Sequence, residues 1–171
     1  MEGVLKAGGS PPQGRMGSVR QGPPPLNTHG SDVRCPMATL PAVVIDTNVF
    51  VAALFRTDSH AARLVAHVRQ GAYRMVWNEE TKRETHAIVA KIPPIEWASV
   101  ECLFDEGCQF AGLTSPGSFL AVPDPDDRKF AALAHASGAI LISQDSDLLD
   151  HPERLPILVL TPKEFLDGIW M

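Results

Sequence analysis

Two short apolar runs, each followed by an acidic residue, constrain the fold of this chain more than any other feature. Residues 42–45 read AVVI before Asp46, and residues 139–143 read AILIS before Gln144 and Asp145. Unbroken apolar runs of this length are typical of strands that are buried on both faces in a parallel sheet. The chain is therefore expected to be an α/β protein with a central, mainly parallel sheet.

The other segments alternate between helix and strand signals. We expect helices over residues 59–70, 78–91, 95–106 and 124–138, a short helix opened by a capping box at residues 161–164, and strands over residues 73–77 and 157–160. Residues 107–123 are predicted to be mainly loop. Helices that connect parallel strands pack on the faces of the sheet, so this order predicts a three-layer α/β/α architecture.

The clearest helix start is the sequence DPDD at residues 124–127. It offers Asp124 as N-cap, Pro125 at the first helical position and Asp127 at the third, where a carboxylate complements the helix dipole. Capping alone would explain both aspartates. From the sequence, Asp124 and Asp127 could therefore be helix caps or members of a functional site.

Composition divides the chain into two parts. Residues 1–36 are rich in Gly, Pro, Ser and Gln without apolar periodicity, so we expect a disordered extension followed by a domain over residues 37–171. No apolar run is long enough to span a membrane and no secretory signal is seen, so the expected location is the cytoplasm, with no membrane partner. Three cysteines without CxxC spacing argue against a disulfide framework and a cysteine zinc site.

The charge of the chain is acidic, with a formal net charge of −5 at pH 7. Phosphate binding usually draws on clustered Lys and Arg, so this balance argues against a nucleic-acid partner unless the acidic groups are concentrated in one place. The location of the acidic residues therefore decides how the net charge is interpreted.

Four carboxylates occupy positions that suit a common site. Asp46 and Asp145 follow strands, and ligands bind beyond the carboxyl ends of strands in open parallel sheets. Glu84, in the helix after the second strand, and Asp127, at the start of another helix, could face the same edge. Carboxylates held close together are stable as anions mainly when a hard cation such as Mg²⁺ or Mn²⁺ neutralises them, and such a cation supports phosphodiester hydrolysis.

These residues are also compatible with other interpretations. Glu84 alone could be a solvated helix residue, and Asp145 a turn residue. A phosphatase that uses Asp46 as nucleophile would need a second carboxylate at position 48, where the chain has Asn48. A phosphoacceptor receiver domain would need an acidic pair ahead of its phosphoacceptor strand, and dinucleotide binding would need GxGxxG after the first strand; both are absent.

Four segments together resemble a PIN domain. They read VVIDTNVFVAAL, RETHAIVAKI, DPDDRKFAALAHASGAILISQDSDLL and LPILVLTPKEF, and they span about residues 41–166. The chain is most similar to the bacterial PIN proteins regarded as toxins of toxin–antitoxin systems, which are relatives of the VapC-type toxins. The resemblance implies a parallel sheet sandwiched by helices, divalent-metal-dependent cleavage of RNA, a cognate antitoxin and a homodimer.

The resemblance also assigns residues. It implies catalytic and metal-binding roles for Asp46, Glu84, Asp127 and Asp145, and an auxiliary metal role for Asp124. Asn48 and Ser143 would orient the carboxylates or water from beside them. The alternative function is a PIN fold that binds RNA or protein without cleaving.

Overall fold

The computed structural model describes residues 40–93, 95–150 and 152–168, all within the unit Arg34–Met171. The sequence-based prediction of a disordered extension over residues 1–36 lies outside the described residues. None of the helices in the described ranges is both long enough and apolar enough to cross a membrane.

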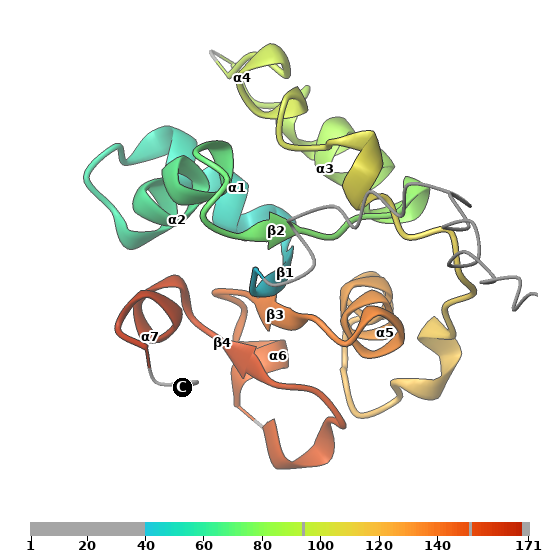
Figure 1. Cartoon of the computed structure of the whole chain (residues 1–171). Coiled ribbons are helices and arrows are strands. Elements are labelled where there is room, and N and C mark those ends of the chain that lie inside the picture. The colour runs from blue at the N-terminus through green and yellow to red at the C-terminus, as the bar shows by residue number, and fades with distance from the viewer. Residues whose placement is uncertain (1–39, 94, 151, 169–171) are drawn as a thin grey trace, which may run out of the picture. The chain divides into compact units, whose positions relative to one another are not determined.

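A four-stranded parallel sheet forms the centre of the domain (Figure 1). Its strands are β1 (Ala42–Ile45), β2 (Arg74–Met75), β3 (Ile140–Ile142) and β4 (Val159–Leu160), in the order β2-β1-β3-β4. Val44 of β1 pairs with Leu141 of β3 in the middle of the sheet. The predicted strands at residues 73–77 and 157–160 exist but are shorter than expected.

Helices cover the sheet on both faces. They are α1 (Thr47–Phe55), α2 (His60–Arg69), α3 (Glu79–Val89), α4 (Ala98–Glu101), α5 (Arg128–Ser137), α6 (Ser146–Leu149) and α7 (Pro162–Leu166). Three 3₁₀ turns complete the described part of the chain: η2 (Glu106–Cys108), η3 (Pro116–Ser118) and η4 (Pro152–Arg154). In Figure 1, α1, α2 and α7 lie on one side of the sheet and α5 lies on the other.

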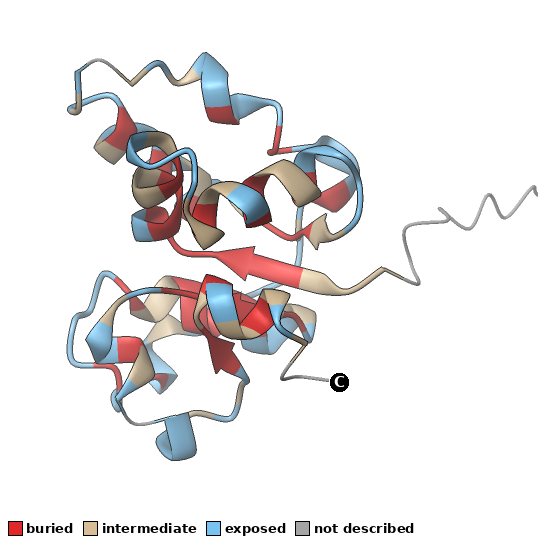
Figure 2. Ribbon diagram, turned by 90° about the vertical axis from the view of Figure 1, so that its left-hand side faces the viewer, coloured by how far each residue is buried: buried red, intermediate tan, exposed pale blue. Residues whose placement is uncertain are grey.

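The alternation of side chains along the strands creates two hydrophobic cores. Val43 and Ile45 of β1 pack with residues of α1, α2 and α7, such as Phe50, Leu64 and Phe165. On the opposite face, Val44, Leu141 and Val159 pack with Phe130 and Leu133 of α5 and with Leu148 of α6. Figure 2, which is viewed from the side of α1, α2 and α7, shows the strands coloured largely as buried. The predicted three-layer α/β/α architecture is confirmed.

Two helices were not predicted. Helix α1 reads TNVFVAALF, which is apolar almost throughout and therefore lacks the 3.6-residue alternation by which a surface helix is recognised. Helix α6 has only four residues, SDLL, too few to show a period. Both begin directly at predicted site residues, since Asp46 is the N-cap of α1 and Asp145 is the N-cap of α6.

The predicted helix over residues 95–106 was largely wrong. Only α4 is α-helical there, and the chain then turns, because side chains satisfy the backbone near Asp105. The Trp77 indole N–H donates to the Asp105 carbonyl at 2.8 Å, and the Asp105 carboxylate accepts from the Gly107 N–H at 2.7 Å. Such local bonds compete with helix formation.

The start of α5 also differs from the prediction. The helix begins at Arg128 with Asp127 as N-cap, three residues later than expected. The Asp124 carboxylate accepts from the Asp126 N–H at 2.8 Å and so closes a turn of its own. Asp124 is therefore not the helix cap that the DPDD sequence suggested.

Candidate active site

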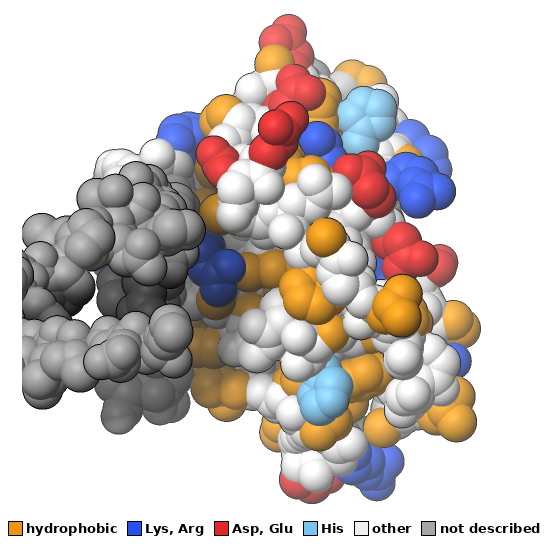
Figure 3. Space-filling model, turned by 45° about the vertical axis from the view of Figure 1, so that its right-hand side comes forward, with side chains coloured by type: hydrophobic (Ala, Val, Ile, Leu, Met, Phe, Trp, Pro, Cys, Tyr) orange, Lys and Arg blue, Asp and Glu red, His pale blue; other side chains and the backbone are white. Residues whose placement is uncertain are grey.

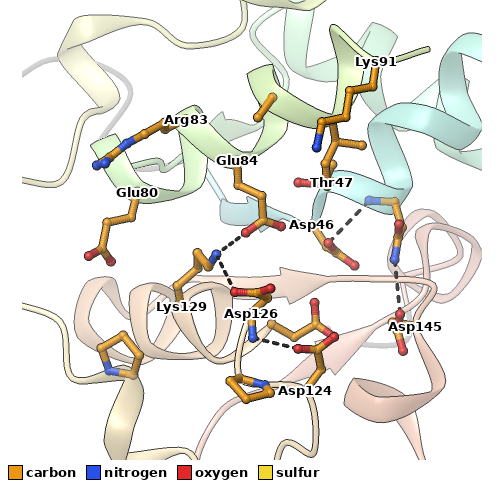
Figure 4. A pocket seen from close by; sticks show the side chains of 16 residues that line it. Asp46, Thr47, Glu80, Arg83, Glu84, Lys91, Asp124, Asp126, Lys129 and Asp145 are labelled. Atoms are coloured by element: carbon orange, nitrogen blue, oxygen red, sulfur yellow. Dashed lines mark hydrogen bonds and ion pairs between the residues drawn. The ribbon is translucent and has the colours of Figure 1, made fainter.

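A pocket of about 780 Å³ lies beyond the carboxyl ends of β1 and β3. Its lining includes all five carboxylates predicted from the sequence: Asp46, Glu84, Asp124, Asp127 and Asp145. They come from four places in the chain: the end of β1, helix α3, the turn before α5 and the start of α6 (Figure 4). The fold thus brings the predicted residues together, while their roles as ligands remain a prediction.

Asp46 is the most deeply buried of these carboxylates, with 1% of its surface exposed. One oxygen accepts a hydrogen bond from the Ser143 hydroxyl at 2.6 Å, and the other accepts from the Asn48 N–H at 3.4 Å. Burial raises the pKa of Asp46, the Ser143 and Asn48 bonds oppose that rise, and repulsion from Asp145 and Glu84 adds to it. The hydrogen bonds therefore hold a carboxylate whose negative charge is poorly solvated.

Asp145 is tied to Asp46 through two intermediate residues. The Asn48 side-chain amide donates to Asp145 Oδ2 at 3.2 Å, and the Asp145 N–H donates to the Ser143 hydroxyl at 3.0 Å. Asn48 and Ser143 thus lie against the carboxylates that they were expected to orient. This network fixes the two strand-end carboxylates relative to each other.

Asp127 differs from both. The residue is 9% exposed, and its carboxylate makes no capping bond to α5 and no hydrogen bond or ion pair to any other described residue. Its pKa is raised to about 7, first by burial and then by repulsion from Asp46, Asp145, Asp124 and Glu84. A carboxylate that lines a pocket beside four other carboxylates, and has no partner within the protein, is costly as an anion and suits a cation.

Glu84 has a partner within the protein. Its carboxylate forms an ion pair with the Lys129 ammonium group, which comes from the first turn of α5, and neither side chain is more than one fifth exposed. The fifth predicted carboxylate, Asp124, is exposed at the pocket edge. The five carboxylates therefore differ in how far the protein itself neutralises them.

Several residues at the site were not predicted. Asp147 lies close enough to Asp127 and Asp145 that one oxygen from each of the three is within 4.8 Å of the others. Its place two positions after Asp145 in the sequence QDSD was a signal for it. Lys129, Arg83 and Lys91 also line the pocket, but their sequence contexts are those of ordinary helix charges.

The pocket accounts for the acidic balance of the chain. Seven of its lining residues are acidic and three are basic, so most of the excess negative charge is gathered at one place. Figure 3 shows acidic and basic side chains interspersed on the upper part of one face, whereas hydrophobic and uncharged side chains dominate below them. The objection that net charge raised against a nucleic-acid partner is correspondingly weaker.

The donor set fits a hard divalent cation. The groups that converge are carboxylate oxygens, which suit Mg²⁺ and Mn²⁺, and the carboxylate of Asp127 has no partner among the described residues. Asp127, Asp145 and Asp147 could hold such an ion together, with Asp46 fixed beside them by Ser143. The arrangement can therefore present a cation to a phosphate at the open mouth of the pocket.

Fold and site first define a class: parallel α/β/α proteins with a carboxylate pocket suited to a divalent metal at the carboxyl ends of the strands. Comparison with protein families then matches residues 42–147 to the PIN domain, and the chain belongs to the PIN domain family. Members of this family are typically metal-dependent nucleases. A comparison with curated proteins found no match.

Proposed function

We propose that this protein is a divalent-metal-dependent endoribonuclease and the toxin of a toxin–antitoxin pair. The observation that carries the nuclease proposal is Asp127, whose carboxylate has no partner among the described residues and lies in a pocket lined by four further carboxylates named by the sequence. A bound cation would neutralise this carboxylate and offset its repulsion from the neighbouring carboxylates. Membership of the PIN domain family supports the same reaction.

In this proposal Asp46, Glu84, Asp127 and Asp145 hold Mg²⁺ or Mn²⁺, with Asp147 added from the structure and Asp124 in an auxiliary role. A cation held there would supply two kinds of chemistry, the polarisation of a phosphodiester oxygen and a lower pKa for a bound water molecule. The side chains of the protein supply the rest of the proposed mechanism.

The chain's contribution is to position charge. Ser143 and Asn48 fix Asp46 and Asp145 before substrate arrives, and a preorganised site need not reorganise during the reaction. Arg83 in α3 and Lys91 just after it line the same pocket and can contact RNA phosphates. A negative centre with cationic side chains beside it suits a metal that meets a phosphate backbone.

The toxin assignment rests on the resemblance to VapC-type proteins. It implies a cognate antitoxin that restrains the activity, a homodimer, and action on RNA in the cytoplasm. Expression of the chain without an antitoxin is expected to arrest bacterial growth, and Asp46→Asn is expected to relieve the arrest. Growth arrest that persists in Asp46→Asn would contradict this part of the proposal.

The ribonuclease proposal is tested with purified protein and single-stranded RNA. Cleavage is expected with Mn²⁺ or Mg²⁺, is expected to stop when EDTA is added, and should fall by about 100-fold in Asp46→Asn, the scale for losing one electrostatic contact in a preorganised site. Asp150→Asn is the matched control, because Asp150 is exposed and does not line the pocket. Absence of cleavage with every divalent ion would contradict the proposal.

One observation favours a second candidate, a PIN fold that binds RNA or protein without cleaving. The Glu84–Lys129 ion pair neutralises a predicted ligand without a metal. This candidate predicts RNA binding that neither depends on divalent ions nor leads to cleavage. The RNA cleavage assay, run with and without EDTA beside an RNA-binding measurement, distinguishes the ribonuclease from the binding module.

A further inference from the structure

Lys129 is the basic side chain most closely engaged with the acidic pocket. It is the second residue of α5, and its ammonium group contacts Glu84 of α3, so that the ion pair joins the two helices (Figure 4). A second carboxylate oxygen, from Asp126, lies 3.7 Å from the same ammonium group. Lys129 therefore has two acidic partners with different environments.

The two partners differ in exposure. The Glu84 side chain is 18% exposed and that of Lys129 19%, so water screens this pair only partly, whereas the Asp126 side chain is 85% exposed. Glu84 is the partner inside the pocket, and Asp126 is a solvated partner at its edge. An ammonium group that leaves Glu84 would still have Asp126 within reach.

The other basic residues of the pocket behave differently. The side chains of Arg83 and Lys91 line the same pocket but make no hydrogen bond or ion pair with any side chain in the described part of the chain. Lys129 is thus distinguished by its attachment to a carboxylate and not merely by its charge. Its ammonium group and a divalent cation would seek the same Glu84 oxygens.

We propose that Lys129 is a built-in counter-cation of the metal pocket, a positioning residue that acts through Glu84. Without metal it neutralises Glu84, and when a divalent cation binds, the ammonium group gives up Glu84 and is retained by Asp126. The inference rests on the proposed function in one respect, namely that this pocket takes a divalent cation. It does not require that RNA be the substrate.

The test is the affinity of the full-length protein for Mn²⁺, measured by electron paramagnetic resonance of the free ion. Lys129→Gln removes the competing cation, so its dissociation constant for Mn²⁺ is expected to fall by about 3- to 30-fold, the range that one nearby charge can produce in a partly screened site. Lys129→Arg keeps the charge and the partner and is expected to stay within about twofold of the parent. Glu84→Gln is expected to weaken binding.

Lys91→Gln is the matched control. It removes the same charge from the same pocket without breaking an ion pair, and the dissociation constant for Mn²⁺ is expected to change by less than about twofold. An equal tightening in Lys91→Gln and Lys129→Gln would show a general charge effect and overturn the proposal. Unchanged or weaker binding in Lys129→Gln would also overturn it.

The same exchange can be followed in the parent protein if Lys129→Gln does not fold. The nitrogen resonance of the Lys129 ammonium group is expected to shift, and its hydrogen exchange to accelerate, when Mg²⁺ is added. A resonance that does not respond to saturating Mg²⁺ would overturn the proposal. A protein that shows the exchange but cleaves no RNA would contradict the proposed function alone, and one that cleaves RNA without the exchange would contradict this inference alone.

Discussion

Two helices of this domain begin with carboxylates that differ in their hydrogen bonding and in the direction of their pKa shifts. At the start of α7, Glu164 accepts hydrogen bonds from the Thr161 N–H at 2.9 Å and from its hydroxyl at 2.8 Å, and these bonds lower its pKa. At the start of α5, the carboxylate of Asp127 accepts no hydrogen bond from any described residue, and burial with nearby negative charges raises its pKa to about 7. The first carboxylate stabilises the fold, whereas the second opposes it.

This difference teaches how to separate a helix cap from a candidate ligand. Both residues suit the dipole of a helix N-terminus, so position in the sequence does not distinguish them. For these two residues hydrogen bonding does, because the Glu164 carboxylate satisfies the Thr161 N–H, whereas the Asp127 carboxylate accepts no bond from a described residue and keeps its oxygens free for a cation. We therefore expect the ionised carboxylate of Glu164 to stabilise the folded protein and that of Asp127 to destabilise it.

The largest effect is expected at Asp127. Asp127→Asn should abolish metal-dependent cleavage and at the same time stabilise the metal-free protein. The pKa is about 7 in the folded state against an ordinary value of 3.8, so the folded protein holds this proton longer than the unfolded chain does. The parent therefore loses stability as pH rises from about 4 to about 7, and Asn, which does not titrate, avoids a loss of at most about 4 kcal/mol.

Urea unfolding of parent and variant between pH 4 and pH 8 in EDTA measures this effect. The two curves should agree near pH 4 and separate as pH rises, with the variant more stable above pH 7. Saturating Mg²⁺ should remove most of the separation, because it binds the ionised parent. A variant that cleaves RNA at the parent rate, or that is less stable at pH 8, would contradict the contrast with Glu164.

A smaller effect of the opposite sign is expected at Glu164. Glu164→Ala removes the two hydrogen bonds that the Glu164 carboxylate accepts from Thr161, while the N–H of residue 164 still donates to the Thr161 hydroxyl, and should cost about 0.5–1.5 kcal/mol of unfolding free energy at pH 7. Because the pKa of Glu164 is lowered in the folded state, this contribution is present above its ordinary pKa and fades as pH falls through the lowered value. Cleavage should be unchanged, since Glu164 does not line the pocket; a gain in stability at pH 7 would refute the assignment.

Much of the fold could be predicted from the sequence because buried strands and amphipathic helices have distinct periods. The run AVVI, the apolar stripe of α2 and the capping box of α7 all gave local signals that the tertiary structure kept. Helix α1 was not predicted because it is apolar on nearly every side and so shows no helical period. The helix predicted at residues 95–106 failed because contacts from Trp77, distant in the sequence, turn the chain at Asp105.

Some residues of the candidate site could likewise be predicted from the sequence, and others could not. Asp46 and Asp145 could be placed because each directly follows a strand, and strand ends of a parallel sheet share one edge. The pairing of Glu84 with Lys129 could not be foreseen, since it joins residues 45 positions apart on two helices. Nor could the sequence show which aspartate of the DPDD segment is a cap, because that depends on where α5 begins.

The smallest effect is expected at Asp124, the residue that the sequence favoured as the cap of α5. As an N-cap it would be worth about 0.5–2 kcal/mol. In the structure it is exposed and accepts one hydrogen bond, from the Asp126 N–H, within the turn. Asp124→Ala loses that bond but also removes a negative charge that raises the pKa of Asp127. The two changes oppose each other, so the unfolding free energy at pH 7 should shift by no more than about 0.5 kcal/mol, with part of the cleavage activity retained. A loss near 2 kcal/mol in urea unfolding would mean that α5 begins where the sequence suggested, and Asp127 would then lie in the first turn of the helix.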